Sequence, residues 1–137
     1  MLRKLALKVT TIAFALSCST RAFSLCVEQK LANAFQSAEA VIAAKVIETR
    51  PHKINGWQVL TLSTQKIWKR SRTQTKTILA FDSPERPPFI VGEDYLMFLE
   101  KPIDGKLSIG KCSPRTRETR LAGDDIIEIE KRISSNR

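Results

Sequence analysis

Residues 40–68 read AVIAAKVIETRPHKINGWQVLTLSTQKIW and contain two strand patterns that are separated by a turn signal. Ala40 to Thr49 is rich in β-branched and small apolar residues and stops at Arg50-Pro51, which predicts a strand. Asn55-Gly56 favours a tight turn between extended segments. Trp57 to Trp68 alternates apolar with polar residues, which predicts a long second strand.

The rest of the chain continues this pattern with shorter elements. Short apolar runs predict further strands at Thr77–Phe81, Tyr95–Leu99 and Lys106–Ile109. Apolar residues at spacings of three and four predict a short helix that starts near Val27 and reaches Ala38. A second helix is expected from Gly123 to Ile133, because its acidic start and basic end suit the helix dipole. The loop from Asp82 to Pro88 holds three prolines and cannot join a sheet interior.

Five short strands flanked by two small helices fit a mainly β protein. We expect a five-stranded barrel of the oligonucleotide/oligosaccharide-binding (OB) type, with a short N-terminal helix and a C-terminal helix. Closure of such a barrel removes free sheet edges and suits this number of strands. A five-stranded α+β sheet is the alternative.

The first 24 residues carry the pattern of a cleaved secretory signal peptide. Basic residues at positions 3, 4 and 8 precede an apolar run over 9–18, and Ala22 and Ser24 form a small-x-small cleavage site. The run is shorter than the roughly 20 residues of a membrane-spanning helix. Cleavage would leave residues 25–137 as a single domain, exported to the periplasm or the extracellular space. An N-terminal helix that stays in the fold is the alternative, and Cys18 could be the lipid-bearing residue of a bacterial lipoprotein.

Composition narrows the function classes. The full chain of 137 residues has a net charge of +9, but removing residues 1–24 leaves 19 basic against 14 acidic residues, a net charge of +5. A moderate positive charge makes nucleic acid an unlikely partner class. The single histidine, His52, and three cysteines offer little material for a metal site or a nucleophile–base pair. We therefore expect no enzyme activity, no cofactor and no metal.

The two cysteines that follow the signal sequence are expected to pair. Cys26 and Cys112 lie near opposite ends of the exported chain, and in an oxidising compartment such an even pair predicts one structural disulfide. A redox or nucleophilic cysteine is less consistent with the sequence, because it contains no C-x-x-C motif.

Other side chains allow both a functional and a structural interpretation. Trp57 and Trp68 could stack nucleic-acid bases, but core packing is the more frequent role of such strand residues. Asp124-Asp125 could serve acid/base chemistry, although its place at a helix start is explained by the dipole. Basic loop residues could bind polyanions or anionic lipids, or could be solvated surface charges; they are Arg70, Arg72, Lys76, Arg115, Arg117 and Arg120.

Several segments, taken in order, resemble a known family. A cysteine just after the signal sequence is followed by motifs at Ser37–Val46, Lys66–Lys69, Val91–Phe98 and Gly110–Arg117. This order is similar to that of the netrin-module group, and specifically of small bacterial proteins related to the tissue inhibitors of metalloproteinases. The resemblance implies an OB barrel whose N-terminal segment is tethered to the loops by disulfides, of which Cys26–Cys112 would be the second.

The chain departs from the family at its functional end. Members usually begin with Cys-x-Cys, whose first cysteine chelates the protease zinc through its amine and carbonyl and pairs with a mid-chain cysteine. Here the corresponding residues are Ser24-Leu25-Cys26, and the segment Phe81–Phe89 contains no cysteine. The resemblance thus implies an exported binding module whose partner-binding ridge is Leu25, Cys26 and Val27, with an extracytoplasmic metalloprotease as candidate partner. The alternative is a basic module for polyanions or envelope lipids, held at the membrane only if Cys18 is lipidated.

Overall fold

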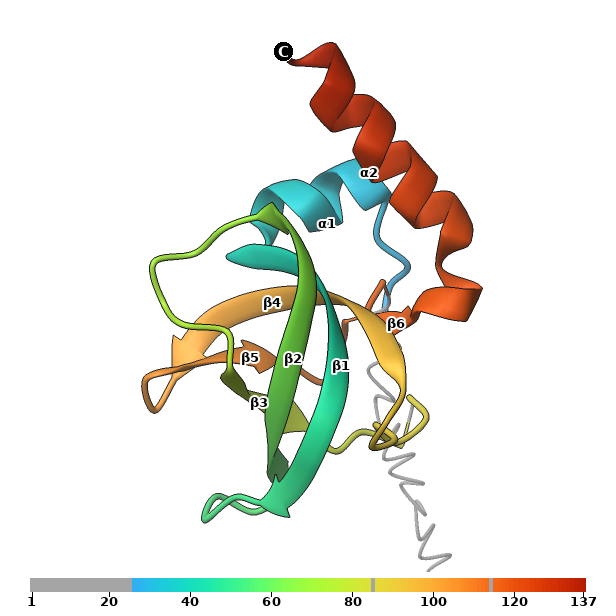
Figure 1. Ribbon diagram of the computed structural model, residues 1–137. Helices are drawn as coiled ribbons and strands as arrows, with labels where there is room; N and C mark the ends of the chain where they lie inside the picture. The colour runs from blue at the N-terminus through green and yellow to red at the C-terminus, as the bar shows by residue number, and fades with distance from the viewer. Residues whose placement is uncertain (1–25, 85, 114) are drawn as a thin grey trace, which may run out of the picture.

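The computed structural model describes residues 26–84, 86–113 and 115–137 (Figure 1). The expected signal peptide and Leu25 lie outside these residues. The elements in chain order are α1 (Leu31–Ser37), β1 (Ala40–Pro51), β2 (Trp57–Lys69), β3 (Thr77–Phe81), β4 (Asp94–Ile103), β5 (Lys106–Ile109), β6 (Arg117–Glu118), the 3-10 helix η1 (Thr119–Leu121) and α2 (Gly123–Ser135).

Within the described residues, five strands close into a barrel in the order β1-β2-β3-β5-β4. The barrel is closed because β1 pairs with both β2 and β4, so that Ala44 lies opposite Thr64 on one side and Tyr95 on the other. All pairings in this ring are antiparallel except that of β3 with β5. The OB-type barrel is confirmed, and an open α+β sheet is wrong for this chain.

The barrel interior is filled by alternate residues of each strand. Successive side chains of a strand point to opposite faces, so every second residue of β1 and β4 lies inside. Small residues in β1 leave room for larger ones from β4 and β5. The buried cluster contains Ala40, Ile42, Ala44, Val46, Leu60, Leu62, Ile78, Ala80, Phe89, Tyr95, Met97, Leu99, Leu107 and Ile109.

A second apolar cluster covers the outside of β1 and β4, where α1 and α2 pack against the barrel (Figure 1). Val41, Leu96 and Phe98 point outward and are buried beneath Leu31, Ala34 and Ala38 of the α1 region and Ala122 and Ile129 of the α2 region. Within these two strands, residues 40–44 and 95–99 are buried on both faces, which explains why these stretches are continuous apolar runs. Lys69 of β2 donates to the carbonyls of Phe35 and Gln36 and so caps the C-terminal end of α1.

Three details differ from the sequence-based expectations. The first helix begins at Leu31 and leaves Val27 outside it, 84% exposed. The fourth strand continues past Leu99 to Ile103, because it changes partner from β1 to β5 with an irregularity between Glu100 and Ile103. The short β6, which pairs with β4, was not expected, because two residues are too few to form a pattern.

Candidate functional site: the ridge at the Cys26–Cys112 disulfide

Cys26 and Cys112 form the expected disulfide, with their Cα atoms 5.2 Å apart. The bond joins the segment before α1 to the loop after β5, across a sequence separation of 86 residues. Cys26 is half-buried and Cys112 is exposed, so the bond lies at the surface. A disulfide is compatible with an exported protein, because such bonds persist in oxidising compartments.

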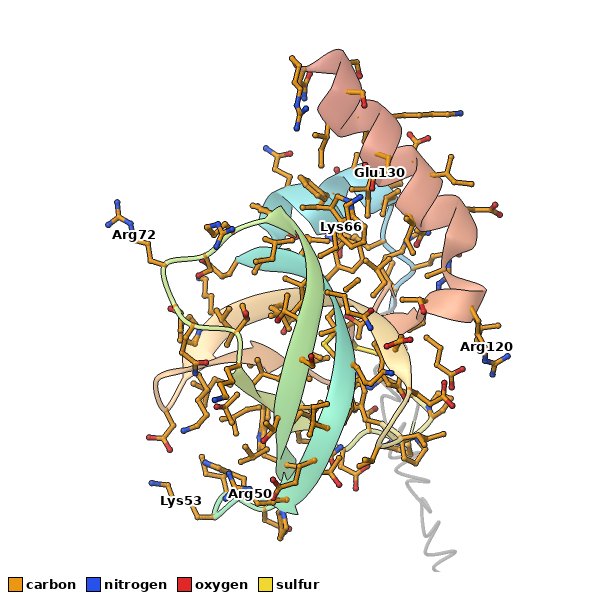
Figure 2. All side chains as sticks on the ribbon, in the orientation of Figure 1. Arg50, Lys53, Lys66, Arg72, Arg120 and Glu130 are labelled. Atoms are coloured by element: carbon orange, nitrogen blue, oxygen red, sulfur yellow. A yellow bond between two sulfur atoms is a disulfide. The ribbon has the colours of Figure 1, made fainter. Side chains whose placement is uncertain are left out.

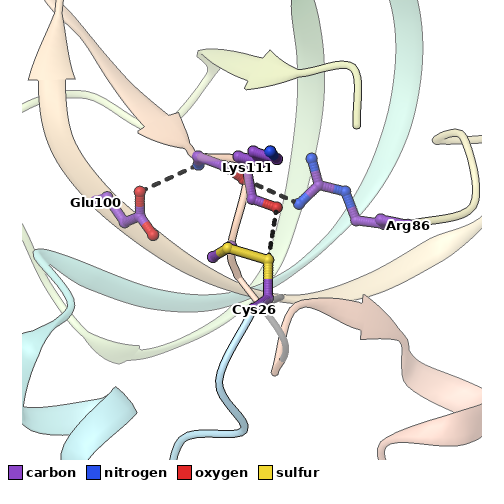
Figure 3. Close-up of a disulfide and its surroundings, with 6 residues drawn as sticks. Cys26, Arg86, Glu100 and Lys111 are labelled. Carbon is purple, nitrogen blue, oxygen red and sulfur yellow. Dashed lines mark hydrogen bonds between the residues drawn. A yellow bond between two sulfur atoms is a disulfide. The ribbon is translucent and has the colours of Figure 1, made fainter. Parts of the chain in front are cut away.

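The loop that carries Cys112 is held by two charged side chains from distant parts of the chain (Figure 3). The Glu100 carboxylate accepts a hydrogen bond from the Gly110 N–H at 3.1 Å. Arg86 donates to the Gly110 carbonyl at 3.3 Å and also to the Phe81 carbonyl. A Cβ atom at position 110 would lie 2.6 Å from a Glu100 carboxylate oxygen, so a larger residue there would displace the carboxylate from this position. The disulfide is therefore attached to a braced loop.

Burial dominates the electrostatics of this brace. It raises the pKa of Glu100, although the Gly110 N–H and the Arg86 charge act in the opposite direction. It lowers the pKa of Arg86, opposed by the negative charges of Glu100 and Asp82. Both groups are partly removed from water, and fixed hydrogen bonds replace much of their hydration.

The ridge itself presents an apolar side chain to solvent. Val27 directly follows the disulfide-bonded Cys26 and is 84% exposed. Beside it lies a shallow, open surface depression, lined by Val27, Glu28, Gln29, Lys30, Asn33 and Cys112. Of the expected ridge, the structure thus places Cys26 and Val27 together at the surface.

The segment behind the ridge is anchored by Arg115. Its Nε atom donates to the Gln29 carbonyl at 2.9 Å, and its Nη1 atom donates to Asp125 at 3.0 Å. The same carboxylate pairs with Arg117 at 3.2 Å. Asp125 is buried, so its two arginine partners provide the compensation that a buried charge requires. Arg115 and Arg117 are therefore held in ion pairs with Asp125 and are not unpaired charges available to a polyanion. Asp125 does more than interact with the helix dipole, because it compensates these two arginines.

The other basic candidates remain at the surface. Arg70, Arg72 and Lys76 lie on the β2–β3 connection, where they are exposed and form no ion pair with any described residue. Figure 2 shows Arg72 extending away from the barrel. Arg120 also projects outward in that view, but it pairs with Glu118.

Both tryptophans have structural contacts. Trp68 packs against the outer apolar cluster, and its indole N–H donates to Glu130 of α2 at 3.0 Å. Trp57 is half-buried and meets Phe81 edge to face, with ring centroids 5.3 Å apart. The interpretation of Trp68 as a packing residue is correct, whereas Trp57 lies at the margin of the barrel.

His52 links two turns at one end of the barrel. Its Nδ1 atom accepts from the Ile54 N–H at 3.2 Å, and its Nε2 atom lies 3.3 Å from Asp104 in the β4–β5 turn. The positive charge of Lys53 and the hydrogen bond with His52 lower the pKa of Asp104. His52 therefore connects the turn between β1 and β2 to the turn between β4 and β5.

No group of three or more candidate metal-ligating side chains occurs among the described residues. No helix in the described ranges is long and apolar enough to cross a membrane. A comparison with protein-family models finds no match, and neither does a comparison with curated protein sequences.

Sequence reasoning missed the brace formed by Arg86, Glu100 and Gly110. A weak signal was present, because Glu100 directly follows the apolar run Tyr95–Leu99, where a charge needs a partner. The sequence could not predict which residues meet Glu100, because Arg86 and Gly110 are distant in sequence and come together only in the closed barrel.

Proposed function

We propose that this protein is an exported, non-enzymatic binding module that presents the ridge Leu25–Cys26–Val27 to a protein partner. The observation that supports this most is the exposed Val27 side chain beside a disulfide whose loop is braced by Arg86 and Glu100. A segment held in one conformation before binding loses little conformational entropy when it docks. An apolar residue on such a segment is suited to insertion into a cleft.

The candidate partner is an extracytoplasmic metalloprotease, in keeping with the resemblance of the sequence to metalloproteinase inhibitors. Ser24 stands where that family has its zinc-chelating cysteine, so we expect the processed protein to inhibit zinc endopeptidases weakly or not at all. A panel of such enzymes tests this expectation. Nanomolar inhibition, lost when one alanine is added before the processed N-terminus, would contradict it, because the extra residue moves the amine by about 3.5 Å.

One observation favours a second candidate function, a basic module for polyanions or anionic envelope lipids. Arg70, Arg72 and Lys76 are exposed on one connection and form no ion pair within the described ranges. Binding of this kind should weaken steeply between low and physiological ionic strength, whereas ridge docking should not.

Site-specific photo-cross-linking in the exporting cell tests the ridge. A photoreactive residue at position 27 should yield one major protein adduct. The matched control is position 127 on the outer face of α2, where Ile127 is also exposed, at 56%. A third probe at position 72 reports on the basic connection. Adducts from position 72 or 127 but none from position 27 would contradict the proposal.

The second arm of the experiment uses substitutions. Val27→Glu should abolish capture of the adduct partner by purified protein, while Ile127→Glu should leave it unchanged. Both side chains are exposed, so neither substitution removes core packing. Equal capture by both variants would show that Val27 does not contact the partner.

A further inference from the structure

The connection between β2 and β3, residues 70–76, presents a row of cations to solvent. Exposure alternates along it: positions 70, 72, 74 and 76 are exposed, whereas 71, 73, 75 and 77 are half-buried. The exposed positions hold Arg70, Arg72, Gln74 and Lys76. Three of these four outward side chains are cations, and Arg72 points away from the barrel (Figure 2).

Hydrogen bonds hold this connection in one conformation. The side-chain amide of Gln74 accepts from the Thr77 N–H and donates to the Thr77 carbonyl, both at 3.1 Å. The Leu62 N–H of β2 donates to the Lys76 carbonyl at 2.8 Å. Because the backbone is braced against the barrel, the cations are positioned before any ligand arrives, which limits the entropy lost on binding.

No local carboxylate offsets these charges. Residues 57–81, from the start of β2 to the end of β3, contain five basic residues and no acidic one. Lys66 pairs with Glu130 of α2, but Arg70, Arg72 and Lys76 form no ion pair with a described residue. Cations without nearby counter-charges produce a positive local potential, which attracts anions.

Two further lysines flank the connection. Lys69 precedes it and donates to two backbone carbonyls of α1, so its charge is not neutralised by a carboxylate there. Lys106 begins β5. The parallel register of β3 and β5, with Leu79 opposite Ser108, brings Lys106 level with Thr77 at the end of the connection. The charge of Lys106 also acts on a carboxylate in the β4–β5 turn.

The neighbouring side chains define the kind of anion. None of the exposed large apolar residues of the described chain falls within 57–81, so this surface has nothing to insert into a bilayer, which stable surface binding requires beside charge. Residues 70–76 contain no aromatic ring to stack on a nucleic-acid base. The nearby indole of Trp68 is packed and donates to Glu130. Charge and hydrogen bonds alone therefore recognise the ligand.

We propose that this braced connection binds an acidic glycan, a polysaccharide chain that carries sulfate or phosphate groups, through Arg70, Arg72 and Lys76. A guanidinium group donates two parallel hydrogen bonds to such an oxyanion, and an ammonium adds a point charge. This inference deepens the second candidate function and rests on it. It does not depend on the ridge.

The probe is a fluorescent heparin oligosaccharide, titrated with the processed protein between about 50 and 200 mM salt. In single-stranded nucleic acids the logarithm of the affinity falls with the logarithm of the salt concentration by about 0.7 per cationic contact. We expect a similar value here, so three contacts should give a slope of about 2.

Single neutralisations locate the site. Arg72→Gln should weaken heparin binding about threefold, the size expected for an exposed charge pair, and should lower the salt slope by about 0.7. The matched control is Lys131→Gln, which removes an exposed lysine on α2 that also forms no ion pair with a described residue. It should leave both quantities unchanged. All of these side chains are exposed, so no core packing is lost.

A second variant separates position from charge. Gln74→Ala keeps every cation and removes the two hydrogen bonds to Thr77. It should weaken heparin binding severalfold at every salt concentration, with the slope unchanged, because the cations remain but are no longer held in place.

Two other polyanionic probes complete the test. An oligothymidylate of equal charge should bind no more tightly than heparin, and phosphatidylglycerol vesicles should bind more weakly. Equal losses in Arg72→Gln and Lys131→Gln, or tighter binding of the oligothymidylate, would overturn the proposal. Binding to the vesicles without binding to heparin would also overturn it but would leave the second candidate function standing. Binding to none of the three probes would contradict both.

Discussion

Reduction of the Cys26–Cys112 disulfide should lower the free energy of unfolding by about 4 kcal/mol. The bond closes a loop of 86 residues, which contains the whole barrel. In the chain-entropy model such a loop restricts the unfolded chain by about 15 cal/mol/K, equivalent to about 4.6 kcal/mol at 25 °C. The reduced native state regains some freedom in residues 26–30, which lowers the expected loss slightly. That freedom is limited, because Arg115 still holds the Gln29 carbonyl.

Urea unfolding of three proteins measures this loss. The oxidised protein is compared with its reduced form and with Cys112→Ser. All three are processed to residues 25–137, which lack Cys18, so that no third thiol can exchange with the bond. The midpoint should fall and the slope m should rise, because an unfolded chain without the cross-link exposes more surface. Amide exchange of residues 26–30 should accelerate while that of β1 and β4 stays slow at low urea.

Two outcomes would refute this reasoning. A difference below about 1 kcal/mol between oxidised and reduced protein would mean that the bond does not restrict the unfolded chain as the loop model requires. Unchanged exchange in residues 26–30 after reduction would mean that the ridge is rigid without its disulfide. The disulfide would then not be the bond that holds Val27 in one conformation before binding.

Three further predictions concern the leader and two carboxylates. The intact mass of the protein purified from its exporting host should show the loss of residues 1–24. A retained Met1 would contradict export, and a diacylglyceryl group on Cys18 would establish a lipoprotein. Because the pKa of Glu100 is raised in the folded state, its ionisation destabilises the fold as the pH rises above 4.5. Glu100→Gln should therefore gain stability relative to wild type between pH 4.5 and 7. Urea midpoints that show a relative loss of stability over this range would contradict this. Asp125→Asn should cost about 3 kcal/mol in thermal or urea unfolding by leaving two arginines uncompensated, whereas the exposed Asp124→Asn should cost less than about 0.5 kcal/mol; equal losses would contradict the role of Asp125.

Much of the local structure could be predicted from patterns of neighbouring residues in the sequence. The strands at Thr77–Phe81 and Lys106–Ile109 have the predicted bounds, and the turn at Asn55-Gly56 separates β1 from β2 as expected. Alternation of apolar and polar residues reports burial of one strand face, and this depends only on neighbours two positions apart. Val27 was misassigned to the first helix because its spacing fits the helical period. The disulfide at the preceding residue directs the chain elsewhere, a constraint that periodicity does not contain.

The sequence by itself determined the order of the strands along the chain, favoured a small barrel over an open α+β sheet, and predicted the pairing of Cys26 with Cys112 once the signal sequence that holds Cys18 is set aside. Only the tertiary structure decided which side chains meet. Arg86 and Glu100 converge on Gly110, and Arg115 reaches Asp125, because barrel closure and helix packing bring distant segments together. A pocket lined by Phe89, Tyr95, Arg117 and Leu121 likewise lies between segments that are distant in sequence. Such contacts depend on how β4 changes partner from β1 to β5, and no pattern of a few residues records that geometry.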